Sequence, residues 1–264
     1  MKISRVLNFI KPVSALGPLL IAALCSLPLR ADDQAEVNAL LDSFDNLWIE
    51  NQTFAEITMK VSTQQFNREL KLKYWGKGAD KSLVRIVYPP KEKGVSTLRV
   101  GKDVYNFVPK IGRTTKISDA LMSQSWMGSH LTNSDLMRTT HLATEYDVKL
   151  LEKKKGAQGT DIWILEALAK PSVATLHQRL LIHFDSKTRL PIEQDFFDKT
   201  QKLLRTFTYS AVKNYNGKLV PSHIHVVPAD SELKGESTEF IYDKIDRKSK
   251  IGDNTFSLTE LSDL

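Results

Sequence analysis

The chain has 264 residues, of which 41% are hydrophobic, and a formal net charge of +6 at pH 7. Four basic residues and no acidic residue fall within the first 31 positions, which leaves +2 for the rest of the chain. This excess is small and lacks a clustered basic face, so the composition argues against nucleic-acid binding. The remaining length, without a Pro- or Ser-rich linker, favours one large all-β domain over two small ones.

The first 31 residues have the pattern of a secretory signal peptide. Lys2, Arg5 and Lys11 precede an apolar run over residues 13–29, and Ala31 ends the segment. The run contains prolines and is short for a spanning helix, so a retained membrane anchor is the weaker alternative. We therefore predict cleavage after Ala31 and a mature domain over residues 32–264 in the periplasm.

Cys25 is the only cysteine and lies inside this segment. Leu24 precedes it, where a lipid-modified cysteine requires a small residue, so lipidation is disfavoured. Cleavage would leave a mature chain in an oxidising compartment without a disulfide or a cysteine-ligated metal. Its stability must then come from packing.

The mature chain begins with a helical pattern and continues with alternating ones. Residues 32–49 place apolar side chains at helical spacing behind two acidic residues, which predicts an amphipathic helix. Period-two alternation then predicts about a dozen strands, over residues 54–61, 68–75, 82–88, 96–100, 104–108, 145–151, 161–167, 175–184, 191–197, 203–212, 219–227 and 238–245. Turn residues separate many of these segments.

So many meandering strands predict a mainly β fold, a single curved antiparallel sheet that curls to hide its apolar face. Such an incomplete, half-open β-barrel needs a cover over its mouth. The helix-like segments 32–49 and 117–142 are the candidates for a helical lid.

Residues 125–136 are the most distinctive part of the second segment. Large apolar side chains such as Trp126 and Met127 stand there beside Gly128, and Trp and Met adapt well to irregular ligands. Ser129, Thr132 and Ser134 suit helix caps, and Asp135 suits a helix start. The segment is either a movable apolar flap or a permanent plug that completes the core, and the pattern alone does not separate the two.

Three motifs in this order resemble one known family. They are residues 85–95, residues 104–117 and Ser125-Trp126-Met127-Gly128-Ser129. The chain resembles the outer-membrane lipoprotein-sorting proteins with the LolA-like fold, in the branch that accompanies exporters of the resistance-nodulation-division type. Trp126 stands where that branch usually has Phe and His130 where it usually has Asp, whereas the Asp135-Leu136 pair is kept.

The resemblance implies a half-open barrel of the LolA/LolB type that carries the acyl chains of lipoproteins or lipids toward the outer membrane. The expected partners are those chains, an exporter or an outer-membrane acceptor, and transient membrane contact. The residues expected to contact acyl chains come from the lid, the opposing helix and the cavity wall. They are Trp126, Met127, Leu131 and Met137 of the lid, Phe44 and Trp48 of the helix, and Trp75, Tyr105 and Phe107 of the wall, with Tyr74 as the alternative to Trp75 because strand neighbours point to opposite faces.

The histidines are the strongest candidates for catalytic or metal-binding residues. His177 and His183 fall on one strand-like segment, and His223 and His225 on another, so neighbouring strands could form a zinc site. Two further strands separate the segments in a meander, however, and His223 and His225 would then face solvent opposite a buried Ile224. A His-based metallohydrolase is therefore the weaker reading.

Other catalytic patterns are weaker still. The chain has no Gly-x-Ser-x-Gly elbow. Carboxylate pairs such as Asp195 with Asp198, or Asp230 with Glu232, fall at turn-like edges. We expect a protein that is not an enzyme, without a cofactor or metal. A periplasmic sensor of lipoproteins with the same fold remains an alternative.

Overall fold

The computed structural model describes residues 31–48, 51–137, 142–156 and 159–262. The expected signal peptide, apart from Ala31, and the side chains of Trp48 and Met137 lie outside the described part. Within that part, no helix is both long and apolar enough to span a bilayer.

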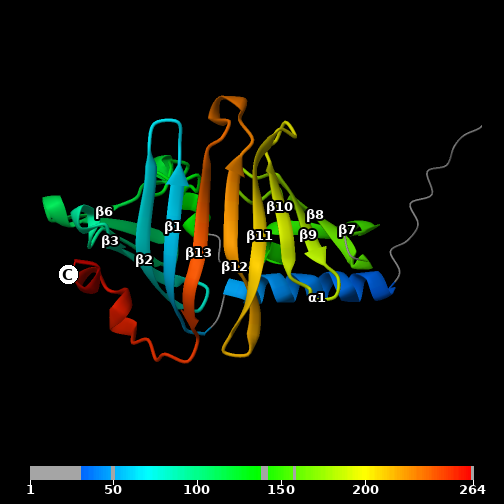
Figure 1. Cartoon of the computed structure of the whole chain (residues 1–264), viewed down its shortest axis with the longest axis horizontal. Helices are drawn as coiled ribbons and strands as arrows, with labels where there is room; N and C mark the ends of the chain where they lie inside the picture. The colour runs from blue at the N-terminus through cyan, green and yellow to red at the C-terminus, as the bar shows by residue number, and fades with distance from the viewer. Residues whose placement is uncertain (1–30, 49–50, 138–141, 157–158, 263–264) are drawn as a thin grey trace, which may run out of the picture.

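One antiparallel sheet of thirteen strands dominates the described chain (Figure 1). Its strands are β1 (Thr53–Ser62), β2 (Asn67–Lys77), β3 (Lys81–Tyr88), β4 (Ser96–Val100), β5 (Asp103–Val108), β6 (Arg113–Lys116), β7 (Tyr146–Lys155), β8 (Asp161–Ala169), β9 (Arg179–Asp185), β10 (Pro191–Phe197), β11 (Leu203–Tyr215), β12 (Lys218–Pro228) and β13 (Ser237–Asp246). The order is β6-β5-β4-β3-β2-β1-β13-β12-β11-β10-β9-β8-β7, so β1 pairs with β13 and the two edge strands remain unpaired with each other. The predicted curved, unclosed, mainly β sheet is confirmed.

Short helices connect and flank the strands. They are α1 (Ala31–Trp48), η1 (Pro90–Glu92), η2 (Pro109–Ile111), η3 (Asp119–Leu121), η4 (Asn133–Met137), α2 (Leu142–Glu145), η6 (Ser231–Leu233), η7 (Asp253–Phe256) and α3 (Leu258–Ser262). The helix predicted at 32–49 is therefore confirmed as α1. The described part of the segment 117–142 contains the short 3-10 helices η3 and η4, where we expected helix-like material.

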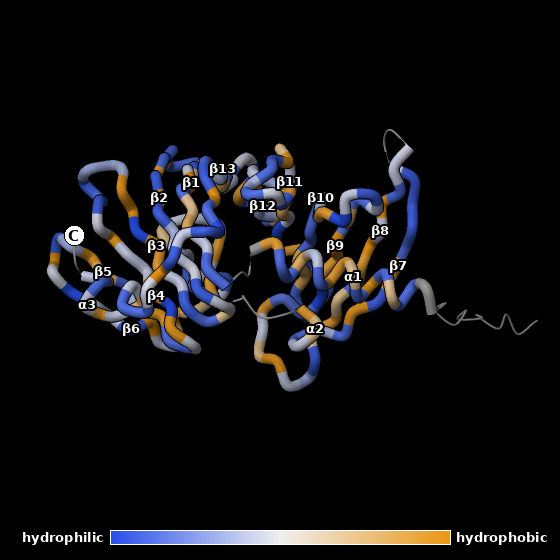
Figure 2. Tube along the Cα trace, turned by 90° about the horizontal axis from the view of Figure 1, so that it is seen from below, coloured by the Kyte–Doolittle hydropathy of each residue, from blue (hydrophilic) through white to orange (hydrophobic). Residues whose placement is uncertain are grey.

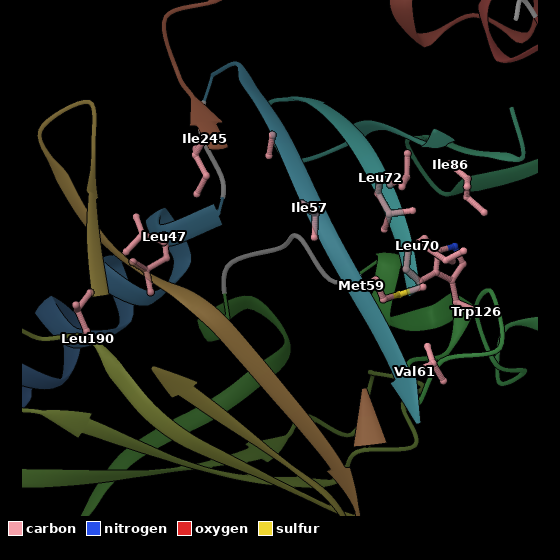
Figure 3. Close-up of a cluster of buried hydrophobic side chains, with 13 residues drawn as sticks. Leu47, Ile57, Met59, Val61, Leu70, Leu72, Ile86, Trp126, Leu190 and Ile245 are labelled. Carbon is pink, nitrogen blue, oxygen red and sulfur yellow. The ribbon is translucent and has the colours of Figure 1, made fainter. Parts of the chain in front are cut away.

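The flap, residues 125–136, covers one half of the inner face of the sheet. Its Trp126 packs in the flap cluster, whose other members include Met59 of β1 and Leu70 of β2 (Figure 3). Alternation in β1 explains this face, because Ala55, Ile57, Met59 and Val61 are all buried.

Helix α1 covers the other half of the sheet. Its Val37, Leu40 and Leu41 join the α1 cluster, which includes Tyr146 of β7 and Phe184 of β9. Figure 2 shows α1 and α2 beside β7–β10, while the C-terminal segment lies at the β3–β6 end.

That C-terminal segment covers the opposite face of the sheet. Ile251, Phe256 and Leu261 form the outer cluster with Leu83 of β3 and Leu98 of β4. Both faces of β4 are thus covered, since Thr97 bonds to the flap and Leu98 packs outward. Over strands β2 to β5, both faces of the sheet are therefore covered by other parts of the chain.

Candidate functional site

A large apolar pocket lies between the flap and the inner face of the sheet. Its empty volume is about 1180 Å³, including space at its mouth. Leu131, Asp135 and Leu136 of the flap border it, and Leu47 of α1 closes one side. The sheet residues that line it are Thr53, Ala55, Ile57, Leu72, Tyr74, Ser82, Val84, Thr97, Arg99, Phe207, Ile224, Phe240, Tyr242 and Ile245, with Arg247 just beyond β13.

A second pocket, with an empty volume of about 1000 Å³ including the open space at its mouth, adjoins the first beneath α1. Phe44 of α1, Tyr146 and Phe196 are among its lining residues. Both pockets share five lining residues, which are Leu131, Asp135, Phe207, Ile224 and Tyr242. The hollow therefore continues along the inner face under both covering segments, a shape that suits a ligand with long apolar chains.

The flap folds back on itself as a tight hairpin. Ser125 and Thr132 form an isolated bridge, and the Trp126 amide donates to the Leu131 carbonyl at 2.8 Å. Met127 and Gly128 form the turn with φ of 49° and 68°. A β-carbon at position 128 would also stand 3.3 Å from Nη1 of Arg68, so glycine suits this turn on two counts.

Trp126 fixes the flap to the sheet by packing and by one hydrogen bond. Its residue is 4% exposed, and Nε1 donates to Oγ1 of Thr97 at 3.1 Å. An indole N–H usually finds an acceptor when it is buried. Arg68 Nη1 adds a bond to the Met127 carbonyl oxygen at 3.0 Å.

A buried ion pair joins the flap to β11. Arg205 donates from Nη2 to Oδ1 of Asp135 at 2.6 Å and from Nη1 to Oδ2 at 2.8 Å, and both side chains are 7% exposed. Burial raises the pKa of Asp135, but the hydrogen bonds and charge of Arg205 outweigh it and hold that pKa below its ordinary value. The bidentate geometry fixes where the flap lies over both pockets.

His130 makes a second polar attachment, to β13. Its Nε2 lies 3.0 Å from Oε2 of Glu236, and its Nδ1 lies 2.8 Å from Oγ1 of Thr238. A hydrogen bond from the Gln64 amide, followed by that of His130, lowers the pKa of Glu236. His130 thus has a structural role at the flap, where the resembling sequences usually carry an acid.

The structure brings part of the predicted ligand-contacting set to the pockets. Trp126 and Leu131 line the first pocket, Leu131 and Phe44 line the second, and Met127 packs against the flap cluster. Phe44 also meets Phe184 edge-on, with ring centroids 5.9 Å apart. Trp48 and Met137 lie outside the described side chains, so their contacts stay a prediction.

Three predicted wall residues lie elsewhere. Trp75, Tyr105 and Phe107 pack in or against the outer cluster, on the face opposite the pockets. This placement departs from our expectation that they line the cavity. Tyr74, the neighbour of Trp75 on β2, points inward and lines the first pocket.

The four histidines of the catalytic alternative are spread over both faces. Strands β10 and β11 separate β9 from β12, as the meander predicted. His177 is buried against Phe196, with centroids 4.9 Å apart, whereas His223 bonds Glu239 at 2.7 Å on the other face. The structure therefore does not bring the four imidazoles together.

Among the described residues, one group has the spacing of metal ligands: His183, Glu193 and Asp195, with atoms within 4.8 Å of one another. These residues lie on β9 and β10, on the face opposite the pockets. Asp195 already accepts a hydrogen bond from Thr206 at 2.6 Å. The charge of Lys154 also reaches His183, where it joins burial in lowering the pKa of that imidazole. The charges of Glu193, Asp195 and Glu152 act on that pKa in the opposite direction.

Sequence reasoning missed the arginines of the site. Arg205 holds the flap, while Arg99 and Arg247 line the first pocket. Arg99 could have been found from strand parity, because it shares a face with Thr97 two residues earlier. Arg205 and Asp135 are 70 residues apart in the sequence, so the local sequence around either residue does not indicate that they pair.

Solved structures with the same fold support this architecture. A DUF1329 family protein from Desulfovibrio piger superposes with a TM-score of 0.77 at 21% identity, covering 87% of this chain and 98% of that one. A LolA superfamily protein from Nitrosomonas europaea gives 0.70 at 21% identity, covering 85% and 98%. An outer-membrane lipoprotein-sorting protein domain from Vibrio parahaemolyticus gives 0.73 at 21% identity, covering 86% and 97%.

A comparison with curated protein sequences finds no match. A family model, described as that of an uncharacterized protein, matches residues 78–263. This range includes the flap, β3 to β13 and the C-terminal segment. The chain therefore belongs to that family, and its fold is LolA-like.

Proposed function

We propose that this protein is a periplasmic carrier that holds the acyl chains of lipoproteins or lipids beneath the flap and moves them toward the outer membrane. The observation that supports this most directly is the apolar pocket bordered by Trp126, Leu131 and Leu136, whose empty volume of about 1180 Å³ includes the open space at its mouth. The lipoprotein-sorting description of the Vibrio protein with the same fold points the same way.

The energetics require a container of this kind. Moving an acyl chain from a bilayer into water costs about 0.8 kcal/mol per methylene group, so long chains do not cross water unaided. Apolar walls such as Ile57, Ile224 and Phe240 replace the bilayer for the chain.

Release of the ligand requires that the flap is also well packed when no ligand is bound. Trp126 is already packed against the flap cluster, and Leu131 and Leu136 face the pocket. If the flap shifts when a chain enters, these side chains exchange contacts with one another for contacts with the ligand. Affinity then depends on the difference between two packed states, which keeps binding reversible.

We further propose that the N-terminal segment directs export and that the protein delivers its ligand to an acceptor. The partner would be an exporter of the resistance-nodulation-division type or an outer-membrane acceptor, reached during transient membrane contact. We assign no catalytic residue; two of the polar residues that line the first pocket, Asp135 and Thr97, hold the flap through Arg205 and Trp126.

The test is the lipid content of protein purified gently from the periplasm. Organic extraction followed by mass spectrometry should recover lipid or lipoprotein acyl chains from the native protein. Leu131→Glu, which places a charge at the junction of both pockets, should lose them. The matched control Leu219→Glu, at a position on β12 that is 47% exposed, should retain them.

Protein that carries no lipid after export, and takes none from vesicles, would exclude the carrier function. Equal lipid content in Leu131→Glu and the native protein would place the acyl chains outside the two pockets.

A further inference from the structure

The face of the sheet opposite the pockets carries one imidazole and two carboxylates at close quarters. His183 of β9 pairs directly with Glu193 of β10, and Asp195 follows Glu193 by two residues. Alternation along the strands therefore points all three side chains to the same face, while Gln194 between the two acids lines the second pocket. One possible ligand atom from each of the three lies within 4.8 Å of the other two.

The distance between His183 and Glu193 suits two ligands of one cation better than it suits a hydrogen bond. Nδ1 of His183 lies 3.5 Å from Oε1 of Glu193. An N–H···O hydrogen bond usually spans about 2.7–3.2 Å between its heavy atoms. Tetrahedral zinc binds nitrogen and oxygen ligands at about 2.0–2.2 Å, which places two of its ligand atoms about 3.3–3.6 Å apart. A zinc ion could thus bind both groups with little movement of either side chain.

The donor atoms of the three residues are available to a cation. Within the described part of the chain, the side chains of His183 and Glu193 form no hydrogen bond, and they face each other at the distance just given. Thr206 donates to Oδ1 of Asp195 at 2.6 Å. This bond orients the carboxylate and leaves its second oxygen for a metal, and carboxylates that bind metals usually have such an outer contact.

The local charge favours a cation as well. Burial lowers the pKa of His183, so its imidazole is neutral at neutral pH and has one unprotonated ring nitrogen. The charged groups that act on this imidazole are Glu193, Lys154, Asp195 and Glu152. Three carboxylates against one ammonium group leave an excess of negative charge, which a divalent cation would balance.

We propose that His183, Glu193 and Asp195 bind one divalent transition-metal ion, with Zn²⁺ as the best fit, on the outer face of the sheet. An imidazole together with carboxylates suits such ions, whereas Ca²⁺ and Mg²⁺ prefer oxygen ligands alone. Three protein ligands leave the fourth position of a tetrahedral ion to water or to an atom of another molecule.

The site is separate from the acyl-chain pockets, because the sheet lies between them. The carrier function therefore does not depend on the metal, and either proposal can fail alone. A bound ion would join neighbouring strands of the native sheet and would stabilise the folded protein by mass action.

Metal analysis, calorimetric titration and thermal unfolding of the mature chain test the proposal. Protein stripped with a chelator should take up one Zn²⁺ per chain, and its melting temperature should rise with the concentration of Zn²⁺. Ca²⁺ and Mg²⁺ at the same concentrations should leave the melting temperature unchanged.

Variants of the ligands locate the ion. His183→Ala and Glu193→Gln should each lower the affinity for Zn²⁺ by at least about 100-fold, the upper end of what the loss of an outer contact costs. The Glu193 side chain is 42% exposed, so Glu193→Gln keeps the test valid if His183→Ala does not fold. Thr206→Val removes only the outer contact of Asp195 and should lower the affinity by about tenfold.

His225→Ala is the matched control. His225 lies in the same row as Glu193 through Thr208 of β11, on the same face of the sheet, and is half-buried like His183. This variant should bind Zn²⁺ as the native protein does. Binding lost in His225→Ala and kept in His183→Ala would overturn the assigned ligands. Native protein that takes up no Zn²⁺, or that has the same affinity as His183→Ala and Glu193→Gln, would overturn the site itself.

Discussion

Helix α1 and the flap cover adjacent halves of the same inner face, but different forces hold them. In α1, Val37 and Leu40 are fully buried and join the α1 cluster. In the flap, Trp126 packs deeply, while Asp135 and His130 attach it through an ion pair and polar contacts. Polar attachments can be exchanged for water, whereas a buried leucine loses its packing when it leaves. We therefore expect helix α1 to belong to the permanent core and the flap to be the segment that moves.

The largest effect expected in this comparison comes from the ion pair. Asp135→Asn removes the charge that balances Arg205 in a site where both side chains are 7% exposed. Breaking a buried pair from one side destabilises by about 3–5 kcal/mol. If the flap opens and hydrates Arg205, as the carrier function requires, much of this loss should appear as local opening, seen as faster hydrogen exchange at the amides of residues 126–136.

The control for this variant is Asp147→Asn on the exposed face of β7, which should leave that exchange unchanged. Protection of the flap amides equal to that of the native protein would show that apolar packing alone holds the flap.

A substitution at Leu40 of α1 should cause a comparable or smaller loss of stability. This loss should affect the whole protein and not the flap alone. Leu40→Ala removes a fully buried side chain, and such changes cost about 2–5 kcal/mol. We expect the loss in the global free energy of unfolding by denaturant, with flap exchange unaffected. Leu219→Ala, at an exposed site, should stay within about 0.5 kcal/mol of the native value. Faster flap exchange in Leu40→Ala would mean that α1 and the flap open together.

Most of the sheet could be predicted from the sequence. Strong alternation located nearly every strand, and β4 and β10 have the predicted bounds. Strand β6 was missed because Arg113-Thr114-Thr115-Lys116 is polar and exposed throughout, as an edge strand often is.

The orientation of strands β2 to β5 was harder to predict, for a physical reason. The C-terminal segment buries Leu83 and Leu98 from outside, so apolar residues occur on both faces there. Tyr105 and Phe107 were then assigned to the inner face, although they pack outward. Alternation identifies two faces but cannot say which one meets the cavity when both are covered.

The attachment of Trp126 should contribute less than the ion pair. Trp126→Phe introduces the residue usual in the resembling branch and removes the hydrogen bond to Oγ1 of Thr97. We expect a loss of about 1 kcal/mol from that bond. A double-mutant cycle with Thr97→Val isolates it from the change in ring size. A coupling energy near zero would show that Trp126 holds the flap by packing alone.

The smallest expected effect is the pH dependence of the contact between His130 of the flap and Glu236. The pKa of Glu236 lies below its ordinary value of 4.5, because the Gln64 amide and His130 bond to the carboxylate. A depressed carboxyl pKa means that this contribution is present above pH 4.5 and is lost as pH falls through the lowered pKa. The protection factors of the flap amides, in which the intrinsic pH dependence of exchange is divided out, should therefore fall on acidification through this range, and Glu236→Gln should remove that dependence.

The variant His130→Asp should reverse the direction of this pH dependence. Nε2 of His130 lies 3.0 Å from the Glu236 carboxylate, so an acid at position 130 would face a like charge. At neutral pH, repulsion between the two carboxylates weakens the attachment of the flap. The same repulsion raises the pKa of one carboxyl, so this group is protonated on acidification and the attachment is restored. The protection factors of the flap amides in His130→Asp should thus rise as pH falls, opposite to those of the native protein. The same pH response in both would show that Glu236 is held by Gln64 alone, and that His130 contributes to flap position only through its bonds to Thr238.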